Sequence, residues 1–393
     1  MATIVPLSYS VRSLLRRRRS TVAAMGGIAL VVLIVSSSLM LGAGIREALS
    51  SAAEADAVIV LRKGSDSEFG SVIERTSASE VIGSAGIQSD ESGSPVASAE
   101  LVAVAALEKQ GARPGDVANI QVRGVPARAF TLRPRIRVVE GTAIQPGSEQ
   151  AIIGARLRGR FPGLELGESF ELRKGRPLRV VGVFEADGAS YESEIWADID
   201  TVAAAFGREG TVSSVRARLV SPDQFDAFAA DLEGDQRLGL EVMRESSFLQ
   251  SQASGISTLV TALGTVITLF FSIGATLGAT ITMYAAVEQR KPEVAILRAL
   301  GFSRGSVLIA FTLEALILAV SGGVIGALGS LALSRFELSM VNFATWSEIV
   351  IAFTPTAETV GTAMIIAVVM GLAGGLLPAL RAAGSVAVPR VAR

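Results

Sequence analysis

Residues Val287 to Arg304 read VEQRKPEVAILRALGFSR, a short charged segment between two long apolar stretches. Pro292 suits the first turn of a helix, because its missing N–H would have no partner there. Gly301 can adopt the left-handed conformation that ends a helix, and Ser303 can cap the next helix, which we expect to begin at about Arg304. The segment therefore predicts a short helix and a tight corner between two membrane spans.

One face of this short helix is apolar. Val294, Leu297 and Leu300 recur at spacings of three, while Arg298 points elsewhere and Glu293 lies at the positive end of the helix dipole. Such a helix can lie at the membrane interface by itself, or it can offer its apolar face to another protein. The residues alone leave both interpretations open.

A family resemblance distinguishes between them. The run EVAILRALGFSR, with Arg290 before it and Leu313-Glu314-Ala315 in the apolar stretch after it, resembles the signature of the MacB/FtsX family of ABC transporter permeases. The resemblance implies a coupling helix that docks on a cytoplasmic ATPase, and Pro292 and Phe302 depart from the usual pattern. The resemblance assigns this coupling role to Arg290, Glu293, Val294, Ala295, Leu297, Arg298, Gly301, Ser303 and Arg304.

Composition places the chain in a membrane and excludes several kinds of chemistry. Half of the 393 residues are hydrophobic, and the mean hydropathy is +0.48. Cysteine and histidine are absent, which excludes thiolate nucleophiles, disulfides, Ser-His-Asp triads and most zinc or haem sites. None of the four lysines follows a glycine, so there is no Walker A motif. We expect no catalytic residue, metal or cofactor on this chain, with ATP bound by a partner subunit.

The N-terminal region predicts a first membrane span. Residues 1–20 hold five arginines, including Arg16 to Arg19, and residues 21–45 carry no charge. The apolar core of a signal peptide is only about 7–15 residues long, so we interpret 21–45 as an uncleaved transmembrane helix. The arginines fit topology and lipid-phosphate anchors better than a nucleic-acid patch.

The remaining charge pattern orders the rest of the chain. The segment 288–304 has four basic and two acidic residues, whereas 335–358 has one basic and three acidic residues. Because basic residues favour the cytoplasmic side, both termini and the coupling segment are predicted to be cytoplasmic. The resemblance implies that the membrane is a bacterial inner membrane. The expected segments are 1–20 (cytoplasmic), 21–45 (helix 1), 46–245 (extracytoplasmic domain), 246–287 (stalk and helix 2), 288–304 (coupling helix), 305–334 (helix 3), 335–358 (extracytoplasmic loop), 359–380 (helix 4) and 381–393 (cytoplasmic tail).

Residues 46–245 form the expected outer domain, with 23 basic and 31 acidic residues, a net charge of -8. Strands are predicted at 57–61 and 215–220, a hairpin at 172–184, and helices at 201–206 and 222–232, with loops or hinges at 88–98 and 187–193. The runs VVEGTAI and LRVVGVFEA resemble the extracytoplasmic domain of MacB-like permeases. The predicted fold is a membrane protein of four transmembrane α-helices, with a large α+β extracytoplasmic domain between helices 1 and 2.

Two features inside the spans are candidates for function. Glu314 is the only charged residue within a predicted span, so it is either an anchor for the coupling region or a proton relay, and anchoring is favoured. Glycines four residues apart allow helices to approach closely, within this chain or at a subunit contact. These pairs are Gly274 and Gly278, Gly322 and Gly326, and Gly371 and Gly375.

The resemblance implies a permease subunit that works by mechanotransmission. A separate ATPase would move the coupling helices, and the outer domains would then drive export or extraction of a substrate. The implied partners are the ATPase, a second permease copy or paralogue, the lipid membrane and a periplasmic adaptor, with no nucleic acid. An FtsX-like regulator of a cell-wall hydrolase is the alternative, and a membrane-anchored enzyme or a sensor is a third class.

Overall fold

The computed structural model describes residues 18–50, 54, 56–111, 113, 115–342 and 346–384. It divides into a helical unit (1–43, 258–336 and 352–393) and a sheet unit (44–257 and 337–351). Residues 1–17 and 385–393, which include most of the predicted cytoplasmic ends, lie outside the described residues. Each unit is described separately below.

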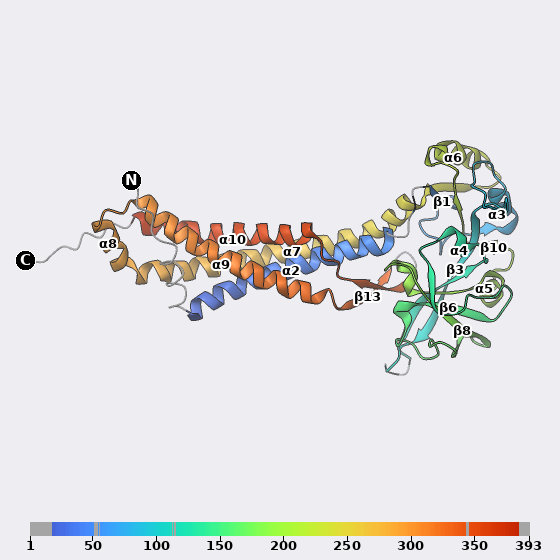
Figure 1. Cartoon of the computed structure of the whole chain (residues 1–393), viewed down its shortest axis with the longest axis horizontal. Coiled ribbons are helices and arrows are strands. Elements are labelled where there is room, and N and C mark those ends of the chain that lie inside the picture. Colours follow the sequence, from blue (N-terminus) through green and yellow to red (C-terminus); the bar gives the residue numbers. More distant parts are fainter. Residues whose placement is uncertain are drawn as a thin grey trace, which may run out of the picture. The chain divides into compact units, whose positions relative to one another are not determined.

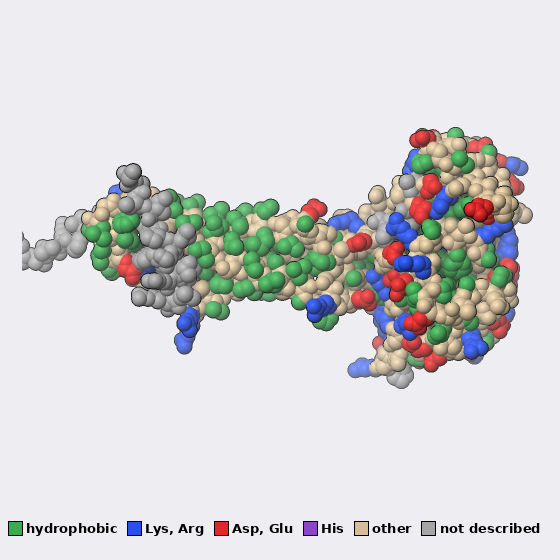
Figure 2. Space-filling model, in the orientation of Figure 1, with side chains coloured by type: hydrophobic (Ala, Val, Ile, Leu, Met, Phe, Trp, Pro, Cys, Tyr) green, Lys and Arg blue, Asp and Glu red, His purple; other side chains and the backbone are tan. Residues whose placement is uncertain are grey.

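Within the described residues, four helices are long and apolar enough to cross a membrane. A fifth, short helix, α8 (Lys291–Ala299), lies between the second and third of them. Figure 2 shows hydrophobic side chains over the visible surface of these helices. The long helices, labelled in Figure 1, are α2 (Arg18–Ser50), α7 (Glu245–Gln289), α9 (Arg304–Leu333) and α10 (Ala357–Gly384).

Small residues let α9 pack closely against its neighbours α2 and α10. A Cβ added at Gly326 would lie 2.3 Å from the carbonyl oxygen of Ala29, and one at Gly375 would lie 2.2 Å from the Cβ of Ala315. Two of the three predicted glycine pairs therefore serve contacts within the chain. A Cβ on Gly274 or Gly278 of α7 would meet nothing within 4 Å.

The sheet unit contains one ten-stranded mixed sheet among its described residues. Its strand order is β12-β1-β11-β3-β4-β9-β6-β8-β5, with β7 paired to β8. The pairs β4–β9 and β6–β8 are parallel, and the other pairs are antiparallel. The strands of this sheet are β1 (Ala57–Arg62), β3 (Ala97–Glu108), β4 (Val117–Val125), β5 (Arg137–Gly141), β6 (Gln150–Gly154), β7 (Ser169–Arg173), β8 (Arg176–Glu185), β9 (Glu194–Asp198), β11 (Ser214–Arg218) and β12 (Leu240–Arg244).

Short helices cover this sheet and enclose its cores. One apolar cluster lies beneath α5, and another lies between β1, β11 and β12 and the helices α3 and α6. The carboxylate of Asp198 caps α5 by accepting from the N–H groups of Asp200 and Thr201. The remaining elements are β2 (Ile73–Glu74), β10 (Thr211–Val212), α3 (Arg75–Ile82), α4 (Ala129–Leu132), α5 (Ile199–Phe206), α6 (Phe225–Gly234) and the 3₁₀ helices η1 (Ala155–Leu157), η2 (Ser190–Ser193) and η3 (Pro222–Gln224).

The predicted fold class is confirmed, and two segments differ in detail from their sequence-based expectations. The expected hinge at 187–193 contains η2, whose Tyr191, Glu192 and Ser193 are buried, so packing fixes it. The expected loop at 335–358 contains a hairpin of β13 (Glu337–Asn342) and β14 (Ser347–Ala352). The segment 187–193 has no apolar run, whereas the run Ile349 to Phe353 is a strand signal within 335–358 that the expectation of a loop overlooked.

Candidate functional site

The helix α8 has the start and end that its sequence predicts. Pro292 lies in its first turn, and Gly301 ends it at φ +93°. The N–H of Phe302 donates to the carbonyl of Leu297 at 3.1 Å, and that of Gly301 donates to the carbonyl of Arg298 at 3.2 Å. This pair of bonds is the Schellman motif, which satisfies the last carbonyls of the helix and turns the chain sharply.

Only part of the predicted apolar face of α8 is available to a partner. Val294 is 4% exposed and packs in a cluster with Val307 and Phe311 of α9. Leu300 is 71% exposed, and Ile296, which the sequence analysis did not single out, is 61% exposed. The prediction of one shared stripe is therefore wrong at Val294, because α8 packs that residue against its own neighbours.

A buried ion pair holds the start of α8 against α9. Arg290 Nη1 donates to Glu314 Oε2 at 2.7 Å, with 7% and 3% of the two side chains exposed. The Arg290 guanidinium also lies 5.0 Å from the ring centroid of Phe311, and its Nε lies 3.2 Å from Glu293 Oε2. Glu314, an anchor or proton relay by sequence, thus contacts the residue that precedes α8.

The other predicted coupling residues lie around this joint. Glu293 has 52% of its side chain exposed. Arg298 donates to the carbonyl of Phe302 at 3.1 Å, which braces the corner. Ser303 accepts from the N–H of Ser306 and caps α9, and Arg304, the first residue of α9, is exposed. Leu297 is half-buried and lines a small cavity with Arg290 and Glu314.

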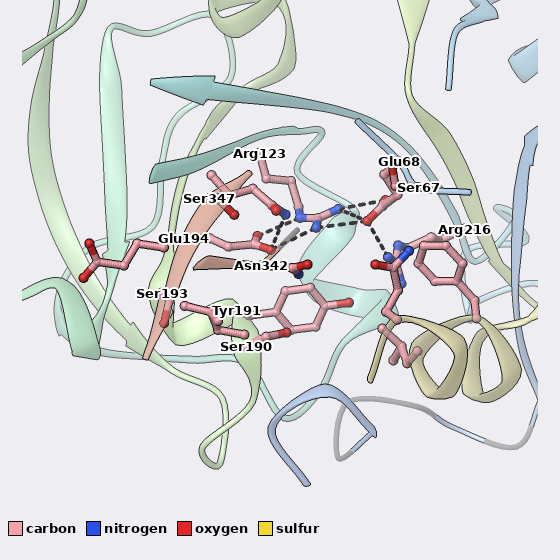
Figure 3. A pocket seen from close by; sticks show the side chains of 16 residues that line it. Ser67, Glu68, Arg123, Ser190, Tyr191, Ser193, Glu194, Arg216, Asn342 and Ser347 are labelled. Carbon is pink, nitrogen blue, oxygen red and sulfur yellow. Dashed lines mark hydrogen bonds and ion pairs between the residues drawn. The ribbon is translucent and has the colours of Figure 1, made fainter. Parts of the chain in front are cut away.

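The sheet unit contains a second candidate, a cluster of buried charges (Figure 3). Arg123 on β4 is at its centre: it lies 3.0 Å from both Glu68 and Glu100 and 2.8 Å from Glu194. Arg216 on β11 lies 2.9 Å from Glu68 and also pairs with Glu245, the first residue of α7. These side chains are at most 8% exposed, and Arg133 completes the cluster through two bonds to Glu100.

Mutual pairing fixes the charges of this cluster. Burial raises the pKa of Glu68, but the charges of Arg123 and Arg216 outweigh it and hold the pKa well below its usual range. Burial is likewise outweighed at Glu100, where Arg133 and Arg123 lower the pKa. Both carboxylates are therefore ionised at neutral pH.

The cluster has the properties of a structural joint. It lines a cavity of about 50 Å³, which is small for an organic substrate. Among the described residues, no group of His, Cys, Asp and Glu side chains could hold a metal ion. Its members come from β3, β4, β9, β11, the segment before β2, the residue after α4 and the start of α7, so it ties these elements together.

Comparison with protein families identifies both regions. The model of the MacB-like periplasmic core domain matches residues 21–235, and that of the FtsX-like permease C-terminal region matches residues 255–386. The first match covers 215 of the 393 residues, and the second includes α8 and Glu314.

Individual relatives are similar over part of their length. The chain is 29% identical over 231 residues to the macrolide export ATP-binding/permease protein MacB 1/2 of Paracoccus denitrificans, covering 56% of this chain and 33% of that protein. It is 25% identical over 222 residues to the uncharacterized ABC transporter permease YknZ of Bacillus subtilis, covering 53% and 52%. The chain thus spans between a third and about half of these relatives.

A solved structure is also similar. The periplasmic region of MacB from Actinobacillus actinomycetemcomitans matches at 13% identity and a TM-score of 0.38, covering 50% of this chain and 92% of that one. The two family models, one of them matching more than half of the chain, provide the decisive evidence. This chain is a multi-pass membrane protein that belongs to the family of ABC transporter permeases with a MacB-like periplasmic core domain and an FtsX-like C-terminal region.

Proposed function

We propose that the chain is the membrane subunit of an ABC exporter in which a separate ATPase moves the sheet unit. The observation that carries this proposal is the form of α8. Its inner side is fixed by Val294 and by the Arg290–Glu314 pair, while Ile296 and Leu300 are exposed at 61% and 71%. A rigidly mounted helix with two exposed apolar side chains suits docking into a cleft of a partner.

These 393 residues hold no Walker A motif, so the proposed ATP-binding site lies outside them. The proposed partners are the ATPase, a second permease copy or paralogue, and a periplasmic adaptor. The proposed location is a bacterial inner membrane, and the charge pattern supports the placement of both termini and α8 on its cytoplasmic side. ATP is bound by the partner, and the permease itself contributes no cofactor.

The long helix α7 supports transmission of motion to the sheet unit. It runs without a break from Glu245 to Gln289, which at 1.5 Å per residue is about 68 Å. Its first residue is held by Arg216 in the buried charge cluster, and its last residue directly precedes the Arg290 joint. Because both ends are fixed, we propose that movement of α8 displaces the sheet unit, which then drives the substrate outward.

Affinity purification of the intact protein in mild detergent, followed by assay of ATP hydrolysis, tests this function. A stoichiometric ATPase should co-purify, and Leu300→Asp should weaken its stimulation about tenfold to a hundredfold, since an exposed side chain that becomes buried contributes about 1.5–3 kcal/mol. Val220→Asp, at a site that is 63% exposed in the sheet unit, is the matched control and should leave stimulation unchanged.

Three outcomes would contradict the proposal. Unchanged stimulation by the Leu300→Asp variant would remove α8 from the interface. A protein that purifies alone and without ATP hydrolysis would instead favour a sensor or an enzyme. Co-purification of an ATPase together with a cell-wall hydrolase would favour the FtsX-like regulator.

A further inference from the structure

The segment between α9 and α10 belongs to the sheet unit. β13 begins at Glu337, shortly after α9 ends at Leu333, and α10 begins at Ala357, shortly after β14 ends at Ala352. Residues 337–351 nevertheless count with the sheet unit. The chain therefore leaves the helical unit, enters the sheet unit as a hairpin and returns.

An acidic side chain on β14 makes the main polar contact of this hairpin. The carboxylate of Glu348, 7% exposed, lies 2.9 Å from Lys109 Nζ and also pairs with Arg160. Arg160 further donates to Ser339 Oγ on β13. One guanidinium thus contacts both strands of the hairpin, and two cations of the sheet unit share one buried carboxylate.

Backbone bonds fix the same strand at a second point. The N–H of Val350 donates to Ser193 Oγ of η2 at 3.1 Å, and the carbonyl of Val350 accepts from Arg156 of η1 at 2.5 Å. Arg156 Nε in turn lies 3.3 Å from Glu192 Oε2. The two 3₁₀ helices thereby hold β14 at its main chain, whatever side chain stands at 350.

The hairpin also covers the buried charge cluster. Asn342, Ser347 and Ile349 line the same small cavity as Arg123 and Glu194, as Figure 3 shows for the labelled residues. The residues of β14 from Ser347 to Ile351 are all at most 7% exposed. This strand is packed as tightly as the core strands and has none of the exposure of a surface loop.

We propose that the β13–β14 hairpin is a latched, force-bearing link between α9 and the sheet unit, closed by Glu348 with Lys109 and Arg160. The link rests on the proposed function. The coupling helix α8 is followed directly by α9 and preceded directly by α7, and both of these helices lead to the sheet unit. Movement of α8 therefore reaches the sheet unit by two arms, through Glu245 at the start of α7 and through the hairpin after α9.

Distance measurement between two spin labels tests the link in the full-length protein in nanodiscs. The chain has no cysteine, so Val117→Cys on β4 and Val341→Cys on β13, at 52% and 45% exposure, can be labelled selectively. The label distance should be single and narrow, and it should stay the same without nucleotide and after vanadate trapping with the ATPase. Glu348→Gln should raise the undocked population about tenfold to a hundredfold, because it removes a charged partner from two hydrogen-bonding cations.

Glu337→Gln is the matched control on the same hairpin. This carboxylate is 53% exposed and lies 3.9 Å from Arg156, so the variant should keep the narrow distance. Two results would overturn the link: a distance in Glu348→Gln as narrow as in the parent, or a parent distance that changes between nucleotide states. Failure of the proposed function appears differently, as a lack of any vanadate-trapped complex. In that case the force-bearing role would be refuted. The label distances measured without nucleotide would still show whether Glu348 holds the hairpin in place.

Discussion

Replacing Arg290 by Met should release α8 from the helices on which it packs. Arg290 Nη1 lies 2.7 Å from Glu314 Oε2, and 7% and 3% of the two side chains are exposed. Removing one partner of a buried ion pair costs about 3–5 kcal/mol, and each 1.4 kcal/mol is tenfold in an equilibrium constant. The undocked population of α8 should therefore rise by about two to three and a half orders of magnitude.

A single buried thiol measures this population. Val294 is 4% exposed and the chain has no cysteine, so in a Val294→Cys background the rate of maleimide labelling in detergent reports opening of α8. Adding Arg290→Met should accelerate labelling in proportion to the undocked population. Glu314→Gln should have a smaller effect, because Arg290 keeps its 3.2 Å contact with Glu293.

The neighbouring Lys291 provides the control. Its pair with Glu288 measures 2.6 Å, but the two side chains are 46% and 50% exposed, and such pairs contribute only about 0–1 kcal/mol. Lys291→Met should therefore accelerate labelling by less than about fivefold. If Arg290→Met is labelled no faster than Lys291→Met, the buried pair does not hold α8, and the reasoning fails.

Two further predictions concern stability. The pKa values of Glu68 and Glu100 are lower in the folded protein than the unfolded-state value of about 4.3, so both carboxylates stabilise the sheet unit above that pH. This stability is lost as the pH falls toward and through the folded-state pKa values. Denaturant unfolding from pH 7 to pH 3 should therefore show a falling free energy of unfolding at the acidic end. Gly326→Ala should destabilise the helical unit by about 1–3 kcal/mol in detergent melts, because its Cβ would lie 2.3 Å from the Ala29 oxygen, whereas Gly274→Ala should be neutral.

The features that depend on local sequence could be predicted. Apolar runs long enough to cross a bilayer predict the four long helices, and Pro292, Gly301 and Ser303 predict the helix α8 and the corner after it. These signals need only the residues next to them in the chain.

The features that depend on contacts between residues far apart in the chain could not be predicted. The residues next to Arg123 do not indicate that it is buried, because its partners Glu68 and Glu194 lie 55 and 71 residues away in the chain. The hairpin reads as a loop because Glu348 is charged, and its partners lie more than 180 residues earlier. Likewise, Val294 was expected to face a partner, and only the fold shows that α9 covers it.

Because α7 is unbroken, its number of residues fixes the rotation about the helix axis between its two ends, and this restricts how its length can change in evolution. A helix advances 100° per residue, so inserting one residue anywhere between Glu245 and Gln289 would rotate everything beyond it by that angle. Insertion of seven residues, close to two full turns, would nearly restore the original azimuth while lengthening the helix by about 10 Å. Natural length variants of such a helix should therefore cluster near insertions of about 7, 11 or 18 residues, which come closest to whole numbers of turns, and single-residue insertions should be rare.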